Sequence, residues 1–79
     1  MAVKASVPIQ TEIEVARIKE VVAALKQPGS EVKSADPVTG PYDIIAEVEE
    51  ETPEQIGALV EDKIHFVPGV FRTVTCLVV

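Results

Sequence analysis

The stretch VTGPYDII, residues 38–45, predicts a turn between two β-strands. The Gly-Pro pair at its centre is typical of a turn. In residues 42–49 every second side chain from Ile44 onward is apolar, as expected for a strand with one buried face. In residues 31–38, Pro37 lacks a backbone N–H, which places that strand at the edge of a sheet.

A first helix is predicted before this pair of strands. Thr11 and Glu14 form a Ser/Thr-x-x-Glu capping box, which favours a helix start, and Pro28-Gly29 favours its end. Apolar side chains recur along the segment at a spacing of three and four residues, which is the period of one helix face. They are Ile18, Val21, Val22 and Leu25.

A second helix is predicted after an acidic run, residues 47–51, which is expected to be a solvated strand end. Thr52 is a suitable N-cap, Pro53 suits the first helical position, and Glu54 favours the positive end of the helix dipole. Pro68-Gly69 is expected to end the helix. The apolar stripe of this helix is Ile56, Leu59, Val60 and Ile64.

Residues 3–9 and 70–79 complete the pattern as a first and a last strand. The order β-α-β-β-α-β over residues 1–79 predicts a single domain with the ferredoxin-like α+β fold. Its four-stranded antiparallel sheet should carry both helices on one face, because the crossovers are right-handed. A chain of 79 residues builds only a marginal core, so self-association is expected to stabilise it.

The last strand predicts how copies of the chain associate. Cys76 is expected to be a small buried hydrophobe within it. Helices cover only one face of such a sheet, so the other face is predicted to be an apolar patch that a sheet-to-sheet homodimer would cover. The evidence is that apolar side chains occupy both faces of the strand: Val70, Val74, Cys76 and Val78 alternate with Phe71, Leu77 and Val79.

The composition argues against several classes of protein. A net charge of −6 disfavours direct binding of nucleic acid, which needs a basic surface. One cysteine and one histidine allow no internal disulfide and no metal-ligand spacing, so neither a metal nor a cofactor is expected. No apolar run reaches the ~18 residues of a membrane span, and the first residues lack a signal-peptide pattern. The expected location is the cytoplasm.

Three segments together resemble the C-terminal effector-binding module of the Lrp/AsnC family of feast/famine regulators. They are VTGPYDII (38–45), VEDKIHFVPGV (60–70) and RTVTCLVV (72–79). The resemblance covers nearly the whole chain and implies a dimeric α/β barrel built from ferredoxin-like modules. Regulators of this family carry an N-terminal helix-turn-helix before the module. This chain begins at the module's first strand, so a stand-alone form without a DNA-reading element is expected.

The resemblance also implies a function. Family modules bind small molecules, typically amino acids, in clefts between dimers that join into rings, commonly octamers. A role in transcriptional regulation follows, with full-length family regulators as further partners. Asp43 is expected to pair with an α-ammonium group, and Gly40 to let backbone amides approach a carboxylate. By position, the implied ligand-binding residues are Thr39, Gly40, Tyr42, Asp43, Thr73 and Thr75.

Simpler roles and other functions stay open at this point. The Gly40 turn could need Asp43 only to accept hydrogen bonds from nearby amides, Tyr42 could only cover the core, and the two threonines could only pack in the sheet. Alternative functions are a small ferredoxin-like enzyme of the monooxygenase or isomerase type and a purely structural ring-forming protein. The enzyme needs a reactive group inside a cavity, whereas His65 is expected at a helix end. A non-enzymatic binding module is therefore the prediction.

Overall fold

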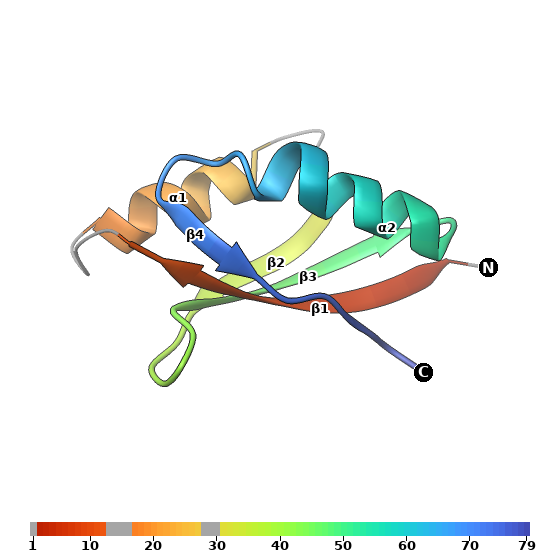
Figure 1. Ribbon diagram of the computed structural model, residues 1–79, viewed down its shortest axis with the longest axis horizontal. Helices are drawn as coiled ribbons and strands as arrows, with labels where there is room; N and C mark the ends of the chain where they lie inside the picture. Colours follow the sequence, from red (N-terminus) through yellow and green to blue (C-terminus); the bar gives the residue numbers. More distant parts are fainter. Residues whose placement is uncertain (1, 13–16, 28–30) are drawn as a thin grey trace.

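The computed structural model describes residues 2–12, 17–27 and 31–79. In these residues an antiparallel sheet carries α1 (Ile18–Leu25) and α2 (Pro53–Leu59) on the same face, as Figure 1 shows. A π-helical segment, η2 (Val60–Ile64), continues α2. The strands are β1 (Val3–Thr11), β2 (Val32–Pro37), β3 (Ile44–Glu50), β4 (Val70–Thr73) and β5 (Cys76–Leu77). The predicted α+β, ferredoxin-like order is confirmed.

The strand order is β2-β3-β1-β4, and every pair is antiparallel. The strand that ends in Pro37 lies at one edge, as its missing N–H predicts. The other edge is the predicted strand 70–79, which is split into β4 and β5 along the same neighbour, β1. Backbone hydrogen bonds hold the split strand to β1: Val74 N–H donates to Pro8 at 3.1 Å, and Val78 N–H donates to Lys4 at 2.8 Å.

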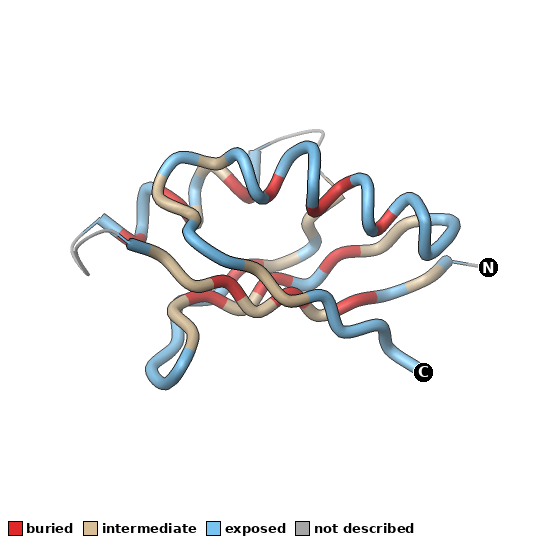
Figure 2. The backbone as a smooth tube through the Cα atoms, in the orientation of Figure 1, coloured by how far each residue is buried: buried red, intermediate tan, exposed pale blue. Residues whose placement is uncertain are grey.

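The core lies between the sheet and the helices. The alternation predicted for β3 is confirmed, because Ile44, Ala46 and Val48 are at most 1% exposed. The neighbouring strand β1 contributes its own buried row, and burial of each large side chain stabilises the fold by about 1.5–3 kcal/mol. Figure 2 shows how these positions alternate along the strands and recur along the helices. The helix side chains in the core are Ile18, Val21, Leu25, Ile56, Leu59, Val60 and Ile64.

The start of α2 agrees with its prediction in detail. Thr52 is the N-cap, its Oγ1 accepts from the Gln55 N–H at 3.2 Å, and Pro53 occupies the first turn. The Gln55 side chain completes the capping box by accepting from the Thr52 N–H at 3.1 Å. The predicted end of this helix is wrong by several residues. Helical structure stops at Ile64, and Pro-Gly lies in the following turn, where Gly69 has φ +97°.

The start of α1 differs from its prediction. The N-cap is Arg17, whose side chain makes no capping bond, and Thr11 belongs to the end of β1. The Thr11 hydroxyl donates to Asp43 Oδ2 at 3.2 Å. Its proposed partner Glu14, and the predicted stop at Pro28-Gly29, fall outside the described residues.

The face of the sheet opposite the helices, here called the outer face, departs most from expectation. Paired residues share a face, so Lys4 and Glu49 lie together on the outer face, and so do Ser6 and Glu47. The prediction of a continuous apolar patch is wrong for these central strands. Cys76 is exposed rather than buried, because it faces outward beside Ser6 on an edge strand.

Among the helices that the structure describes, none is long and apolar enough to span a bilayer. The longest continuous helical segment is formed by α2 and η2 together, which span residues 53–64. A helix that crosses the hydrocarbon core needs about 20 residues.

Candidate functional site

The loop between β2 and β3, residues 38–43, protrudes beyond the sheet (Figure 1). Thr39, Gly40 and Pro41 are exposed at its tip. The Val38 N–H donates to the Asp43 carbonyl at 2.9 Å and closes the loop at its base. Gly40 has φ +134°, a conformation that only glycine adopts at little cost, so this residue type is required by the turn.

Asp43 fastens the base of the loop to the end of β1. Its Oδ2 accepts from the Thr11 N–H at 2.8 Å and from the Thr11 Oγ1 at 3.2 Å. Its own N–H donates to the Ile9 carbonyl at 2.9 Å. Among the described residues, Oδ1 accepts no hydrogen bond. One carboxylate oxygen of Asp43 therefore holds the base of the loop to β1.

The structure brings some of the predicted site residues close to each other and leaves others apart. Asp43 and Thr73 flank β1 from opposite sides, because the first bonds to Ile9 and the second pairs with it. Thr73 shares the helix-side face with Ile9, which is completely buried. Thr75 is exposed at the gap between β4 and β5. Within one chain the loop tip and the edge strand thus form two separate groups.

Tyr42 and Thr11 also lie at the base of the loop. Tyr42 is half-buried beside Asp43. Thr11 is the neighbour of Asp43 that the sequence did not reveal. Its contact with Asp43 spans 32 residues, and the local sequence around Thr11 resembles a helix cap instead.

An open groove of about 670 Å³ runs beside the loop. Its walls are apolar side chains of α1, β2 and the loop, and a lysine lies among them. Thr39 is the only predicted site residue in it. A groove of this kind offers an apolar wall and an ammonium group next to the loop tip. The lining residues are Ile18, Lys19, Pro37, Val38 and Thr39.

Features associated with catalysis are sparse in the part of the chain that the structure describes. It contains no group of three or more His, Cys, Asp or Glu side chains that could hold a metal ion. His65 is exposed at the end of η2, as predicted for a helix terminus, and its ring lies edge-on to Phe66 with centroids 6.0 Å apart. The His65 imidazole is therefore open to solvent and is not enclosed in a cavity.

No protein-family model and no curated protein matches the sequence. Solved structures do match. TTHA0845 from Thermus thermophilus is 31% identical, with a TM-score of 0.81 over 98% of this chain and 92% of its own. AsnC from Escherichia coli is 22% identical, with a TM-score of 0.85 over 98% of this chain and 50% of its own. The transcriptional regulator NMB0573 from Neisseria meningitidis, solved as a complex with L-Met, is 20% identical, with a TM-score of 0.77 over 98% of this chain and 49% of its own.

These matches and the geometry define a ferredoxin-like module of the kind found in regulators. The chain belongs to the Lrp/AsnC family and corresponds to its effector-binding module. It spans about half the length of AsnC and of NMB0573, and nearly all of TTHA0845.

Proposed function

We propose that this chain is a small-molecule-binding and oligomerisation module that serves transcriptional regulation, and that its ligand is an amino acid. The observation that carries the proposal is the β2–β3 loop, which protrudes from the sheet while Asp43 holds its base to Thr11. A loop with a fixed base and an exposed tip can present backbone amides and side chains to a ligand with little loss of conformational entropy on binding.

The proposed ligand chemistry follows from the groups at this loop. Oδ1 of Asp43 accepts a hydrogen bond from the α-ammonium group of the ligand, and backbone amides near Gly40 donate to its carboxylate. Charge-assisted hydrogen bonds of this kind contribute about 1.5–3 kcal/mol each. Hydroxyls of Thr39, Thr73 and Thr75 complete the set. Support for an amino acid comes from NMB0573, which shares the fold and was solved with L-Met.

The proposed assembly brings the loop tip of one chain close to the edge strand of another. A homodimer forms through the outer faces of two sheets, dimers join into an octamer-like ring, and the ligand occupies clefts between dimers. In such a ring the loop tip of one dimer meets a neighbouring dimer, which explains how residues that lie apart within one chain serve one site. Full-length family regulators are further proposed partners, because they carry the same module.

The test is a thermal-shift screen of the twenty amino acids. A ligand at ten times its Kd stabilises the folded state by roughly 1.4 kcal/mol, which raises the Tm of a domain this small by about 6–11 °C. Asp43→Asn should abolish the shift. Asp62→Asn, which neutralises an exposed carboxylate on η2, is the matched control and should keep it. If no amino acid at millimolar concentration moves the Tm of the wild-type chain, the proposed ligand class is wrong.

Thr11→Val separates the two roles of Asp43. This substitution removes the hydroxyl bond at 3.2 Å but keeps both the carboxylate and the amide bond at 2.8 Å. If Asp43 binds the ligand directly, Thr11→Val should retain most of the rise in Tm that the amino acid causes. Equal loss of the shift in Thr11→Val and Asp43→Asn would show that Asp43 only positions the loop.

A further inference from the structure

Among the strand residues that the structure describes, the charges of the outer face sum to zero, whereas the whole chain carries −6. Three basic and three acidic residues lie on this face by strand pairing or by lining its hollow. Because each chain carries a net charge of −6, two copies repel each other on average. The outer face has balanced charges, so two copies that meet through this face do not repel each other there. The residues are Lys4, Lys33, Arg72, Asp36, Glu47 and Glu49.

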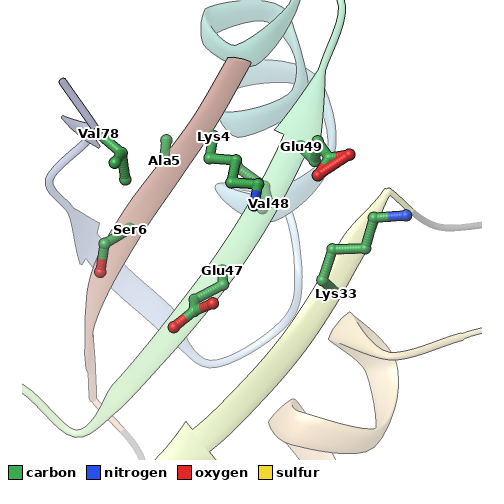
Figure 3. A pocket seen from close by; sticks show the side chains of 8 residues that line it. All are labelled: Lys4, Ala5, Ser6, Lys33, Glu47, Val48, Glu49 and Val78. Carbon is green, nitrogen blue, oxygen red and sulfur yellow. The ribbon is translucent and has the colours of Figure 1, made fainter. Parts of the chain in front are cut away.

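Three adjacent strands arrange these charges in rows. Glu47 and Glu49 on β3 form an acidic row, with Lys4 on β1 to one side and Lys33 on β2 to the other (Figure 3). The side chains border a hollow of about 260 Å³. Among the residues that the structure describes, none of these four takes part in an ion pair. Their charges are therefore available to a partner.

We propose that this pattern selects one arrangement of a second copy, in which the two-fold axis runs parallel to the strands and lies between β1 and β3. In that arrangement each β1 lies over the partner's β3. Lys4 and Glu49 are directly opposite each other in one sheet, so the axis sets Lys4 over the partner's Glu49. The symmetry repeats the contact, because Glu49 then lies over the partner's Lys4.

The remaining central positions agree with this axis. It sets Ser6 over the partner's Glu47 and Pro8 over the partner's Ile45, so polar side chains meet polar ones and apolar side chains meet apolar ones. In the order β2-β3-β1-β4 the line between β1 and β3 is also the middle of the sheet, so the axis buries the whole outer face. Packed sheets lie about 10 Å apart, a gap that Lys and Glu side chains bridge from opposite sides.

An axis that runs across the strands gives the opposite result. It would lay β3 over the partner's β3, and at the level of the acidic row it would set Glu47 over the partner's Glu49 and Glu49 over the partner's Glu47. Like charges in an interface disfavour that arrangement. The charged rows therefore favour the axis parallel to the strands and disfavour the axis across them.

The experiment uses two opposite charge reversals and their mixture. Glu49→Lys alone sets lysine against the partner's Lys4, and Lys4→Glu alone sets glutamate against the partner's Glu49. Each variant should raise the dimer dissociation constant by about tenfold or more in sedimentation velocity. Mixed in equal amounts, the two variants should form a heterodimer with nearly wild-type affinity, because both contacts between chains are then of opposite charge.

The mixture isolates the contact between chains. The cross-strand pair within each chain stays repulsive in both variants, whether they are mixed or alone, so a purely intramolecular effect predicts no recovery. Glu61→Lys makes the same charge change on an exposed position of η2 and should leave the dimer unchanged. Far-UV circular dichroism checks the fold of each variant. If a reversal does not fold, Lys4→Gln and Glu49→Gln provide milder tests, each with a predicted loss of dimer affinity.

This inference rests on the proposed dimer, and the outcomes separate the two. A wild-type chain that stays monomeric at all concentrations, or that forms dimers only with another protein, would overturn both the proposed assembly and the axis. A wild-type dimer whose affinity is unchanged by the reversals, or a mixture that shows no recovery, would overturn the axis alone. Recovery in the mixture, with weakening by salt in the wild type, would support both.

Discussion

Asp43 and Thr11 are joined by two hydrogen bonds although 32 residues separate them in the sequence: the carboxylate Oδ2 accepts from the Thr11 N–H at 2.8 Å and from its hydroxyl at 3.2 Å. A backbone bond from Asp43 to Ile9 at 2.9 Å adds a third connection. These bonds fix the start of β3 to the end of β1. The base of the β2–β3 loop is thereby held in place, and only its tip is left exposed for a ligand or a neighbouring dimer.

The first prediction concerns the strength of this anchor. Asp43→Ala should lower the free energy of unfolding by about 1–3 kcal/mol, because the Thr11 amide loses a charged acceptor in a half-buried place. Thr11→Val removes only the hydroxyl bond and should cost about 0.5–1.5 kcal/mol. Urea unfolding measures both values. A smaller cost for Asp43→Ala than for Thr11→Val would contradict the assigned anchor.

The second prediction compares two glycines. An added Cβ meets no atom within 4 Å at Gly40 or at Gly57, so sterics do not distinguish the two positions. Gly40 has φ +134°, and Gly40→Ala should destabilise the chain by about 1–3 kcal/mol through backbone strain. Gly57 lies inside α2, and Gly57→Ala should stabilise it by about 0.5–1 kcal/mol. Thermal unfolding should therefore show changes of opposite sign, and changes of the same sign would refute this account of the turn.

The third prediction concerns the capping box of α2. Thr52→Ala should cost about 1 kcal/mol, because the Gln55 N–H loses its acceptor. Gln55→Ala should cost less, since the Thr52 N–H is exposed and water can replace the lost bond. The double variant should cost less than the sum of the two, because the bonds are reciprocal. Additive costs in chemical unfolding would show that the two bonds act independently.

The fourth prediction tests the π-helical segment. Ile64 is 1% exposed and belongs to the core, so Ile64→Ala should cost about 2–5 kcal/mol. Phe66 lies two residues later and is 74% exposed, so Phe66→Ala should change the stability by no more than about 0.5 kcal/mol. Guanidinium unfolding of the two variants checks the contrast. A comparable loss in both would mean that Phe66 contacts a partner or the core in solution.

The fifth prediction uses Cys76 to report on the outer face. Its thiol is exposed in the single chain and lies beside Ser6, so the proposed dimer covers it. A thiol reagent should react quickly in dilute solution and slowly above the dimer dissociation constant. The reaction of the unfolded chain in guanidinium is the control and should not depend on concentration. A folded dimer that reacts as fast as the dilute chain would show that the interface leaves this strand open.

Much of the fold was predictable from local pattern. The alternation around Ile44 located the buried face of β3, and the cap at Thr52 located the start of α2. The stripe from Ile56 to Ile64 identified buried side chains even though η2 changes the helix type within it. Each of these signals acts within one element, where the period of the side chains decides which face is buried.

The candidate site was predictable only as a loop. The Gly-Pro turn marked its tip, and the positive φ of Gly40 agrees with that reading. Thr11 was assigned to a helix cap, because its short-range neighbours fit one. The apolar alternation around Cys76 predicted a buried thiol. That prediction is wrong because the pattern of a single strand does not reveal which residues lie beside it or which face is covered.

The sequence alone determined the order of the elements, the strand with Pro37 at the edge, and the inward faces of both helices. Those features depend on residues a few positions apart, whose geometry the backbone sets locally. Only the tertiary structure decided that Asp43 binds Thr11, that Cys76 is exposed, and that the outer face carries rows of opposite charge. Each of these depends on which strands pair and in which register, and contacts between distant segments set that register.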